Sequence, residues 1–184
     1  MLDLKSIDKN WSLFLDRDGV INDEILDKYI LNWEQFHFSK DVLRSFPILN
    51  EKFGSIVIVS NQRGVSKGLM TEKDLLNIHK KMQLEINEAG GRVDQIYFCT
   101  DLDDSCFRRK PNPGMAYEAQ KEFPLIDFSR SVMVGNKPGD MKFGRNAGMF
   151  TVFITTTNPE QPFPHPDIDL RFNSLYEFAQ AIQS

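Results

Sequence analysis

The segment from Trp11 to Asn22 constrains the fold of this chain more than any other. A mostly apolar run, too short for a helix, ends abruptly at Asp16 and Asp18, two carboxylates separated by one residue. This pattern is typical of a buried strand whose end carries polar groups. In an open parallel sheet the carboxyl ends of the strands form the ligand crevice, so we expect both carboxylates to stand where a substrate binds. The same Asp-X-Asp-Gly sequence occurs in ordinary turns, so the rest of the chain must decide.

Four further apolar runs alternate with segments of helical character. Strands are predicted over residues 55–60, 95–99, 131–135 and 150–154. Helices are predicted over residues 39–50, 71–90 and 174–183, and two more begin near Gly114 and Asp140. The alternation favours a parallel sheet with right-handed crossovers. We therefore predict one α/β domain over residues 1–184, with a mainly parallel five-stranded sheet.

Several segments carry local expectations. Residues 20–38 lack a sustained helical period, and we expect them to cross over the site with a small hairpin. Ser39 is expected to cap the following helix, which Pro47 should kink or split. In the helix after Thr71 the apolar stripe should pack in the core, whereas His79 should lie on the solvated face.

Charge and composition argue against several classes of protein. The net charge of −4 is unfavourable for a general polyanion-binding surface, so nucleic acid is not an expected partner. No apolar stretch approaches the roughly 18 residues that span a bilayer. No basic segment followed by an apolar run opens the sequence. Two cysteines fit a reducing compartment. We expect a soluble, cytoplasmic monomer without a membrane partner.

Four of the predicted strands lead into polar side chains, and a parallel topology brings them to one edge of the sheet. These groups are Asp16 and Asp18, Ser60 and Asn61, Lys110, and Asn136 with Asp140. We expect the cations in the predicted loops to form a local basic pocket. They are Arg17, Arg63, Lys67, Arg108, Arg109, Lys110 and Lys137.

This set of residues suits phosphoryl transfer. A carboxylate that attacks phosphorus needs a cation to offset its repulsion from the phosphate dianion, and Mg²⁺ is suited to carboxylate and carbonyl ligands. Asp16 is the expected nucleophile, and Asp18 the general acid and base. Lys110 would neutralise charge on both the nucleophile and the transferring group. Ser60, Asn61 and Gln62 are expected to hold phosphoryl oxygens.

Four motifs resemble those of haloacid dehalogenase-type phosphatases in order, spacing and strand context. They are Phe14-Leu15-Asp16-Arg17-Asp18-Gly19, Ser60-Asn61-Gln62-X-Gly64, Arg109-Lys110-Pro111-X-X-Gly114-Met115 and Val134-Gly135-X-X-X-X-Asp140-Met141. The Arg-Lys-Pro form is most similar to the subgroup that contains heptose bisphosphate and histidinol-phosphate phosphatases. The resemblance implies a Rossmann-like three-layer core, no large cap domain and Mg²⁺ dependence. It also implies metal ligands at Asp16, Asp18, Asn136 and Asp140.

The sequence departs from this subgroup at two places. The subgroup carries a zinc-binding loop of pattern Cys-X-His and Cys-X-Cys, whereas the matching positions here read Cys99-Thr100-Asp101 and Cys106-Phe107-Arg108. Two sulfurs do not fill a tetrahedral zinc site, so no zinc is expected. At Asn136 the family has a magnesium-binding Asp. An amide oxygen still coordinates the ion but brings no charge, so we expect Asn136→Asp to tighten Mg²⁺ binding.

The expected substrate is a small phosphorylated metabolite, a sugar phosphate with a second anionic or polyhydroxylated end. The resemblance favours D-glycero-D-manno-heptose 1,7-bisphosphate, which would lose its 7-phosphate, with Arg108 and Arg109 holding the distal group. The alternatives are a histidinol-phosphate phosphatase, a polynucleotide 3′-phosphatase, and a phosphosugar-binding protein without turnover. The intact Asp16, Asp18 and Lys110 argue against the last of these.

Overall fold

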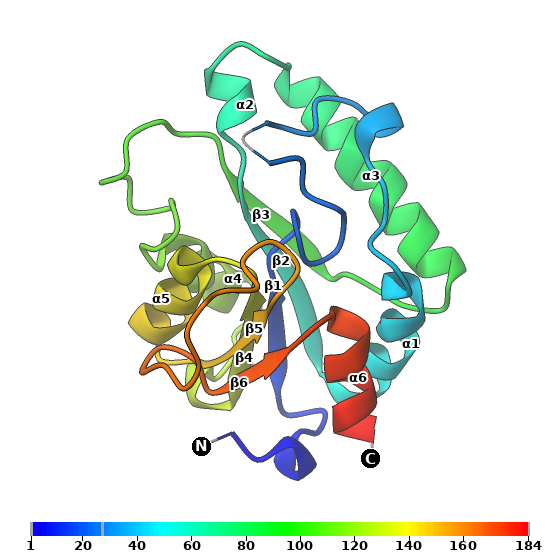
Figure 1. Ribbon diagram of the computed structural model, residues 1–184, viewed down its shortest axis with the longest axis vertical. Helices are drawn as coiled ribbons and strands as arrows, with labels where there is room; N and C mark the ends of the chain where they lie inside the picture. The colour runs from blue at the N-terminus through cyan, green and yellow to red at the C-terminus, as the bar shows by residue number, and fades with distance from the viewer. Residues whose placement is uncertain (1, 27, 184) are drawn as a thin grey trace.

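Six parallel strands form one sheet in the order β3-β2-β1-β4-β5-β6 (Figure 1). The computed structural model describes residues 2–26 and 28–183, and Met1, Asp27 and Ser184 lie outside the described residues. The strands are β1 (Ser12–Leu15), β2 (Ser55–Asn61), β3 (Gln95–Cys99), β4 (Ser131–Gly135), β5 (Phe150–Ile154) and β6 (Leu170–Phe172). The predicted parallel α/β fold is confirmed, with six strands rather than five.

The additional strand, β6, is an edge strand of three residues. It pairs with β5 through Val152 and Leu170, and Asp169 beside it accepts the backbone N–H of Thr151 at 2.9 Å. A sequence of Leu, Arg and Phe is too short to display a period of two, so periodicity does not reveal it.

Helices cover both faces of the sheet (Figure 1). They are α1 (Val42–Lys52), α2 (Arg63–Ser66), α3 (Glu72–Glu88), α4 (Gly114–Glu122), α5 (Pro138–Ala147) and α6 (Leu175–Gln183), with 3₁₀ turns η1 (Leu4–Ser6), η2 (Trp33–Gln35) and η3 (Phe128–Arg130). Along β1, Leu13 and Leu15 belong to the core beneath α1, α3 and α6, whereas Phe14 belongs to the core beneath α4 and α5. Alternate strand residues point to opposite faces, so β1 is apolar on both.

The segment between β1 and α1 differs from the expectation. Residues 20–38 form no hairpin among the described residues; they contain η2 and an isolated bridge between Asn22 and Phe38. The aromatic side chains explain this path, because Trp33 and Phe36 stack with ring centroids 5.0 Å apart and Phe38 packs edge-on against both. The segment is therefore held by aromatic packing and by one antiparallel bridge where its two ends meet, not by a pair of strands.

The helix α1 differs from the prediction at its N-terminus and at Pro47. Asp41, not Ser39, is the N-cap residue, with a φ of 58° and no capping side-chain bond. Ser39 contributes its carbonyl oxygen, which accepts the N–H of Val42 at 3.1 Å. Pro47 lies inside one continuous helix and does not split it. The buried Phe46 and Leu49 hold the helix together across the proline, since tertiary packing outweighs local helix preference.

The long helix α3 begins as predicted. The side chain of Thr71 accepts the N–H of Asp74, and the Asp74 side chain accepts the N–H of Thr71, which is a capping box. The apolar stripe is confirmed as core, but His79 is buried with it. Although α3 has 17 residues, no helix of the described chain is long and apolar enough to cross a membrane.

Candidate active site

A cavity of about 740 Å³ opens where the sequence predicted the site. The predicted site residues in its wall are Asp16, Asp18, Asn61, Gln62, Arg109, Lys110 and Asp140. Further wall residues come from segments where the sequence indicates no site residue, among them Glu24, Lys28, Tyr29, Thr157 and Asn158. The ends of β1, β2 and β4 and the loop after β3 are thus brought together, as the parallel topology requires.

Lys110 joins two buried carboxylates. Its Nζ lies 2.7 Å from Asp16 Oδ1 and 2.7 Å from Asp140 Oδ1, and all three side chains are less than a tenth exposed. Asp140 Oδ2 accepts the backbone N–H groups of Asn136 at 3.2 Å and Lys137 at 3.0 Å. Both oxygens of Asp140 are therefore occupied, and its position suits the orientation of Lys110 better than direct metal binding.

Asp16, Asp140 and Lys110 together carry unequal numbers of negative and positive charges. Burial and the neighbouring Asp140 raise the pKa of Asp16 to about 7. Burial disfavours the ammonium group of Lys110, but Asp140 and Asp16 outweigh burial and raise the pKa of Lys110. One ammonium between two carboxylates leaves an excess negative charge, so a bound cation would favour ionised Asp16.

Asp18 faces a different cation. Nη2 of Arg17 lies 2.9 Å from Asp18 Oδ1 and 3.0 Å from Oδ2, and Gln62 Nε2 donates to Oδ2 at 2.8 Å. Burial opposes the ionisation of Asp18, but the Arg17 guanidinium outweighs this effect and lowers the pKa of Asp18. The two carboxylates of the Asp-X-Asp motif therefore differ in protonation: Asp18 is the more acidic group.

His79 is a further contact of the Arg17 side chain, and the sequence did not indicate this contact. Its Nε2 lies 3.2 Å from Nη1 of Arg17. Since a guanidinium only donates, His79 is neutral with its proton on Nδ1. Burial and the adjacent Arg17 lower the pKa of His79 to about 3. The prediction of a solvated His79 is wrong because the fully buried Arg17 needs an acceptor in the core.

The polar residues that end β2 serve mainly as supports. Asn61 Oδ1 accepts the backbone N–H of Lys110 at 3.1 Å, and its Nδ2 donates to the Lys110 carbonyl at 3.0 Å. Ser60 Oγ accepts from Gln62 Nε2 at 2.7 Å and is buried. Their side chains thus fix the positions of Lys110 and Asp18. Asn61 and Gln62 also reach the cavity wall, but Ser60 does not.

Asn136 follows β4 directly and is fully buried. Its Nδ2 donates to Glu24 Oε2 at 3.1 Å and to Thr157 Oγ1 at 2.6 Å. Its Oδ1 is buried and has no hydrogen-bond partner among the described residues. Asn136 is not among the residues that line the cavity, but its backbone N–H is bonded to Asp140, and a buried acceptor without a donor fits a hard cation. The described residues contain no cluster of three or more His, Cys, Asp or Glu side chains arranged for a metal, so Asn136 and a backbone carbonyl would have to contribute.

The loop after β3 separates the two arginines that were expected to hold a distal anion. Arg108 pairs with Glu118 at 2.7 Å and lines a separate hollow beside the two cysteines, whose sulfurs lie 4.0 Å apart. Arg109 lines the main cavity and pairs with Asp104 at 2.9 Å. Arg109 is therefore placed to meet a group in the main cavity and Arg108 is not, because Arg108 is directed toward Glu118 in α4.

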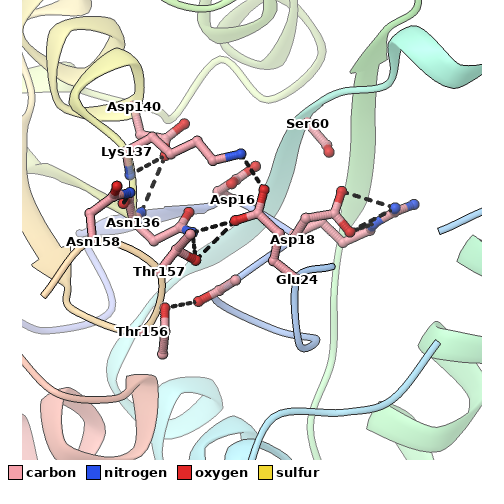
Figure 2. Close-up of polar contacts among 12 residues, drawn as sticks. Asp16, Asp18, Glu24, Ser60, Asn136, Lys137, Asp140, Thr156, Thr157 and Asn158 are labelled. Atoms are coloured by element: carbon pink, nitrogen blue, oxygen red, sulfur yellow. Dashed lines mark hydrogen bonds and ion pairs between the residues drawn. The ribbon is translucent and has the colours of Figure 1, made fainter. Parts of the chain in front are cut away.

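Glu24 and Thr157 are the site residues that sequence reasoning missed (Figure 2). Thr157 follows β5, whose carboxyl end reaches the same edge of the sheet as β1 and β4, so the topological rule could have found it. Glu24 lies in the aperiodic segment after Gly19, where no pattern indicates which side chain turns inward.

The fold and site define a haloacid dehalogenase-type phosphatase, and comparison with known proteins agrees. A family model described as "Polynucleotide kinase 3 phosphatase" matches residues 16–180, so the chain belongs to this family. The resemblance inferred from the four motifs is confirmed.

Relatives with more specific names match along nearly the whole chain. The D-glycero-alpha-D-manno-heptose-1,7-bisphosphate 7-phosphatase of Mycobacterium tuberculosis (strain ATCC 25618 / H37Rv) is 32% identical over 173 residues, 94% of this chain and 91% of the relative. The D-glycero-beta-D-manno-heptose-1,7-bisphosphate 7-phosphatase of Yersinia pestis is 32% identical over 182 residues, 94% and 95% of the two chains. A solved D,D-heptose 1,7-bisphosphate phosphatase from B. bronchiseptica, complexed with magnesium and phosphate, superposes with a TM-score of 0.85 at 26% identity, covering 94% and 98%.

Proposed function

We propose that this chain is a Mg²⁺-dependent phosphatase that removes the 7-phosphate of D-glycero-D-manno-heptose 1,7-bisphosphate. The observation that carries the proposal is Lys110 Nζ, 2.7 Å from Asp16 Oδ1 and 2.7 Å from Asp140 Oδ1. A carboxylate beside fixed positive charge is the arrangement that phosphoryl transfer to a side chain requires. The relatives named for this substrate support the same reaction.

In the first half-reaction, a carboxylate oxygen of Asp16 attacks the phosphorus atom. An aspartyl-phosphate forms while the bond from phosphorus to the sugar oxygen breaks; Asp18 must enter this step protonated, and its proton goes to the departing oxygen. In the second half-reaction, Asp18 takes a proton from water, which attacks phosphorus and releases inorganic phosphate and Asp16. The ion pair with Arg17 favours the ionised form of Asp18 that this second step uses.

The residues that would hold Mg²⁺ are Asp16 through its carboxylate, Asp18 through its backbone carbonyl and Asn136 through Oδ1. When bound, the ion would offset the charge of the phosphate as it approaches Asp16. Asp140 supports the site by holding Lys110, with both its oxygens already engaged. This assignment leaves one carboxylate in direct contact with the ion.

The cavity wall suits a substrate with a second anionic group. Beyond the catalytic residues, it carries five cations: Lys28, Arg63, Lys67, Arg109 and Lys137. Nζ of Lys67 lies 5.1 Å from the Tyr29 ring centroid, and Arg63 and Arg109 both contact Asp104. These charges favour a bisphosphate over a substrate with one phosphate. We propose that the chain acts on this sugar phosphate as a monomer in the cytoplasm.

Replacement of the two aspartates tests the mechanism. Asp16→Asn should lower phosphate release by ~10³-fold or more, because an amide is not a nucleophile. Asp18→Asn should leave slow activity and let a phosphoenzyme accumulate, since the group that activates water is lost. Rapid quench with labelled substrate measures both, with the exposed Asp8→Asn as the control. Full activity of Asp16→Asn would refute the proposal.

A substrate panel tests the specificity. Heptose 1,7-bisphosphate, histidinol phosphate and a 3′-phosphorylated oligonucleotide should be compared by kcat/KM with Mg²⁺ present. We expect the heptose bisphosphate to be preferred. A tenfold or greater preference for histidinol phosphate, or turnover of the oligonucleotide alone, would replace the proposed substrate.

A further inference from the structure

Glu24 reaches from the segment after β1 into the loop after β4 (Figure 2). Its side chain is 15% exposed, and one oxygen, Oε1, pairs with Nζ of Lys137. The other oxygen, Oε2, accepts from Asn136 Nδ2 at 3.1 Å and from Thr157 Oγ1 at 2.9 Å. Both oxygens are engaged by protein donors, so Glu24 is placed to hold its neighbours rather than to bind an ion itself.

These contacts fix the direction of the Asn136 amide. A carboxylate only accepts hydrogen bonds, so the edge of the amide that faces Glu24 must be Nδ2. Thr157 Oγ1 accepts from the same nitrogen at 2.6 Å, and its hydroxyl proton is used toward Glu24. Oδ1 is consequently turned away from Glu24 into the buried position where it has no partner among the described residues.

Gly19 makes room for this arrangement. A Cβ atom at Gly19 would lie 2.0 Å from Asn136 Nδ2 and 2.8 Å from Thr157 Oγ1, and its φ is +86°. The turn that carries the chain away from Asp18 therefore passes directly against the amide. The loops after β1, β4 and β5 meet at one point, where Glu24 contacts Asn136, Thr157 and Lys137.

We propose that Glu24 is a positioning residue for the metal site: through its contact with Asn136 Nδ2 it fixes the direction of Oδ1, the atom that would bind the ion. The inference rests on the proposed function, in which Asn136 Oδ1 is a ligand. It assigns the pair Glu24 and Asn136 the role that a single carboxylate at position 136 would otherwise fill.

The inference changes what Asn136→Asp should do. In the wild-type background the new carboxylate would face Glu24 Oε2 at the present 3.1 Å contact with no N–H between them. Like charges at that distance oppose each other strongly. Once Glu24 is replaced by Gln, the neighbouring amide can donate to the new carboxylate, which is then oriented and contributes its full charge to the ion.

A double-mutant cycle tests this coupling with the ion alone. Mn²⁺ binding, followed by electron paramagnetic resonance with Mg²⁺ as competitor and without substrate, should be compared for the wild type, Glu24→Gln, Asn136→Asp and the double variant. We expect Glu24→Gln to weaken binding about tenfold, within the ~10–100-fold range for groups that orient metal ligands. Asn136→Asp should fail to tighten binding alone but tighten it tenfold or more in the Glu24→Gln background.

Controls separate this role from a loss of folding. The exposed Glu34→Gln removes the same charge from the same segment and should leave binding unchanged, and urea unfolding checks that each variant folds. Thr157→Val, which keeps Glu24, should weaken binding less than Glu24→Gln. Equal effects of Asn136→Asp in both backgrounds would overturn the inference even if the wild type hydrolyses the bisphosphate. A wild type that binds the ion but releases no phosphate would instead reject the proposed function.

Discussion

Arg17 shows how a single buried charge shapes its surroundings. The guanidinium is fully buried, and its donors are directed to Asp18, to Gln62 Oε1 at 3.3 Å and to His79 Nε2. A buried charge without partners would cost several kcal/mol, so each acceptor is needed. The position of Asp18, and hence its proposed role as general acid and base, depends on a histidine in α3.

The neutral state of His79 predicts a pH dependence of stability. The pKa of His79 is about 3 in the folded protein against 6.5 when unfolded. The unfolded chain therefore takes up a proton first, and stability should fall as the pH drops below 6.5, by up to ~1.4 kcal/mol per pH unit. His79→Gln keeps an acceptor for Arg17 but does not titrate, so its loss of stability in this range should be smaller.

Urea unfolding of both proteins at pH values between about 7 and 4 measures the difference. His37→Gln, at an exposed histidine, is the matched control and should follow the wild type. Parallel pH profiles for His79→Gln and the wild type would show that His79 is not held neutral.

At the scale of elements, the sequence predicts a strand reliably when that strand is buried on both faces. The strands β1, β2, β4 and β5 are apolar runs bounded by polar turns, and their existence follows from that pattern. The edge strand β6 and the segment 20–38 depend on pairing and aromatic stacking between distant residues. No local period records such contacts, so these parts could not be predicted.

The helix α5 offers a test of how packing places the site. A Cβ atom at Gly144 would lie 2.7 Å from Thr151 Cγ2 and 2.9 Å from Met133 Cβ, so Gly144→Ala should force α5 away from β4 and β5. We expect a loss of about 1–3 kcal/mol in the free energy of unfolding. Since α5 begins with the turn that carries Asp140, kcat should fall as well.

Gly139→Ala in the same helix is the control for stability. A Cβ atom there meets nothing within 4 Å among the described residues, and alanine favours the helix by roughly 0.5–1 kcal/mol over glycine. Urea unfolding of the two variants should give changes of opposite sign. Equal stability of the two would mean that the contact of α5 with the sheet is not tight at Gly144.

At the scale of the whole molecule, topology carried the prediction of the candidate site further than any motif alone. Parallel strands bring Asp16, Lys110 and Asp140 together although the loops that hold them are far apart in the sequence. The directions of Arg108 and Glu24 could not be predicted, because they depend on the paths of irregular loops.

The distribution of charge over the molecule predicts substrate selectivity. The net charge is −4, yet the cavity wall gathers cations, and Lys67 has no carboxylate within ion-pair distance among the described residues. If Lys67 holds the distal phosphate, Lys67→Gln should raise KM for the bisphosphate ~10–100-fold with little change in kcat. Steady-state kinetics with a substrate of one phosphate should show no such rise, and the exposed Lys121→Gln serves as the control.

The contact between Glu24 and Asn136 joins residues 112 positions apart in the chain. A lineage that exchanges Asn136 for Asp while Glu24 remains would place two carboxylates together, and one that loses Glu24 first would leave the amide without its partner. Each single change is therefore disfavoured, and the two positions should be inherited as a unit. Among descendants of a common ancestor, an aspartate at 136 should accompany an uncharged residue at 24.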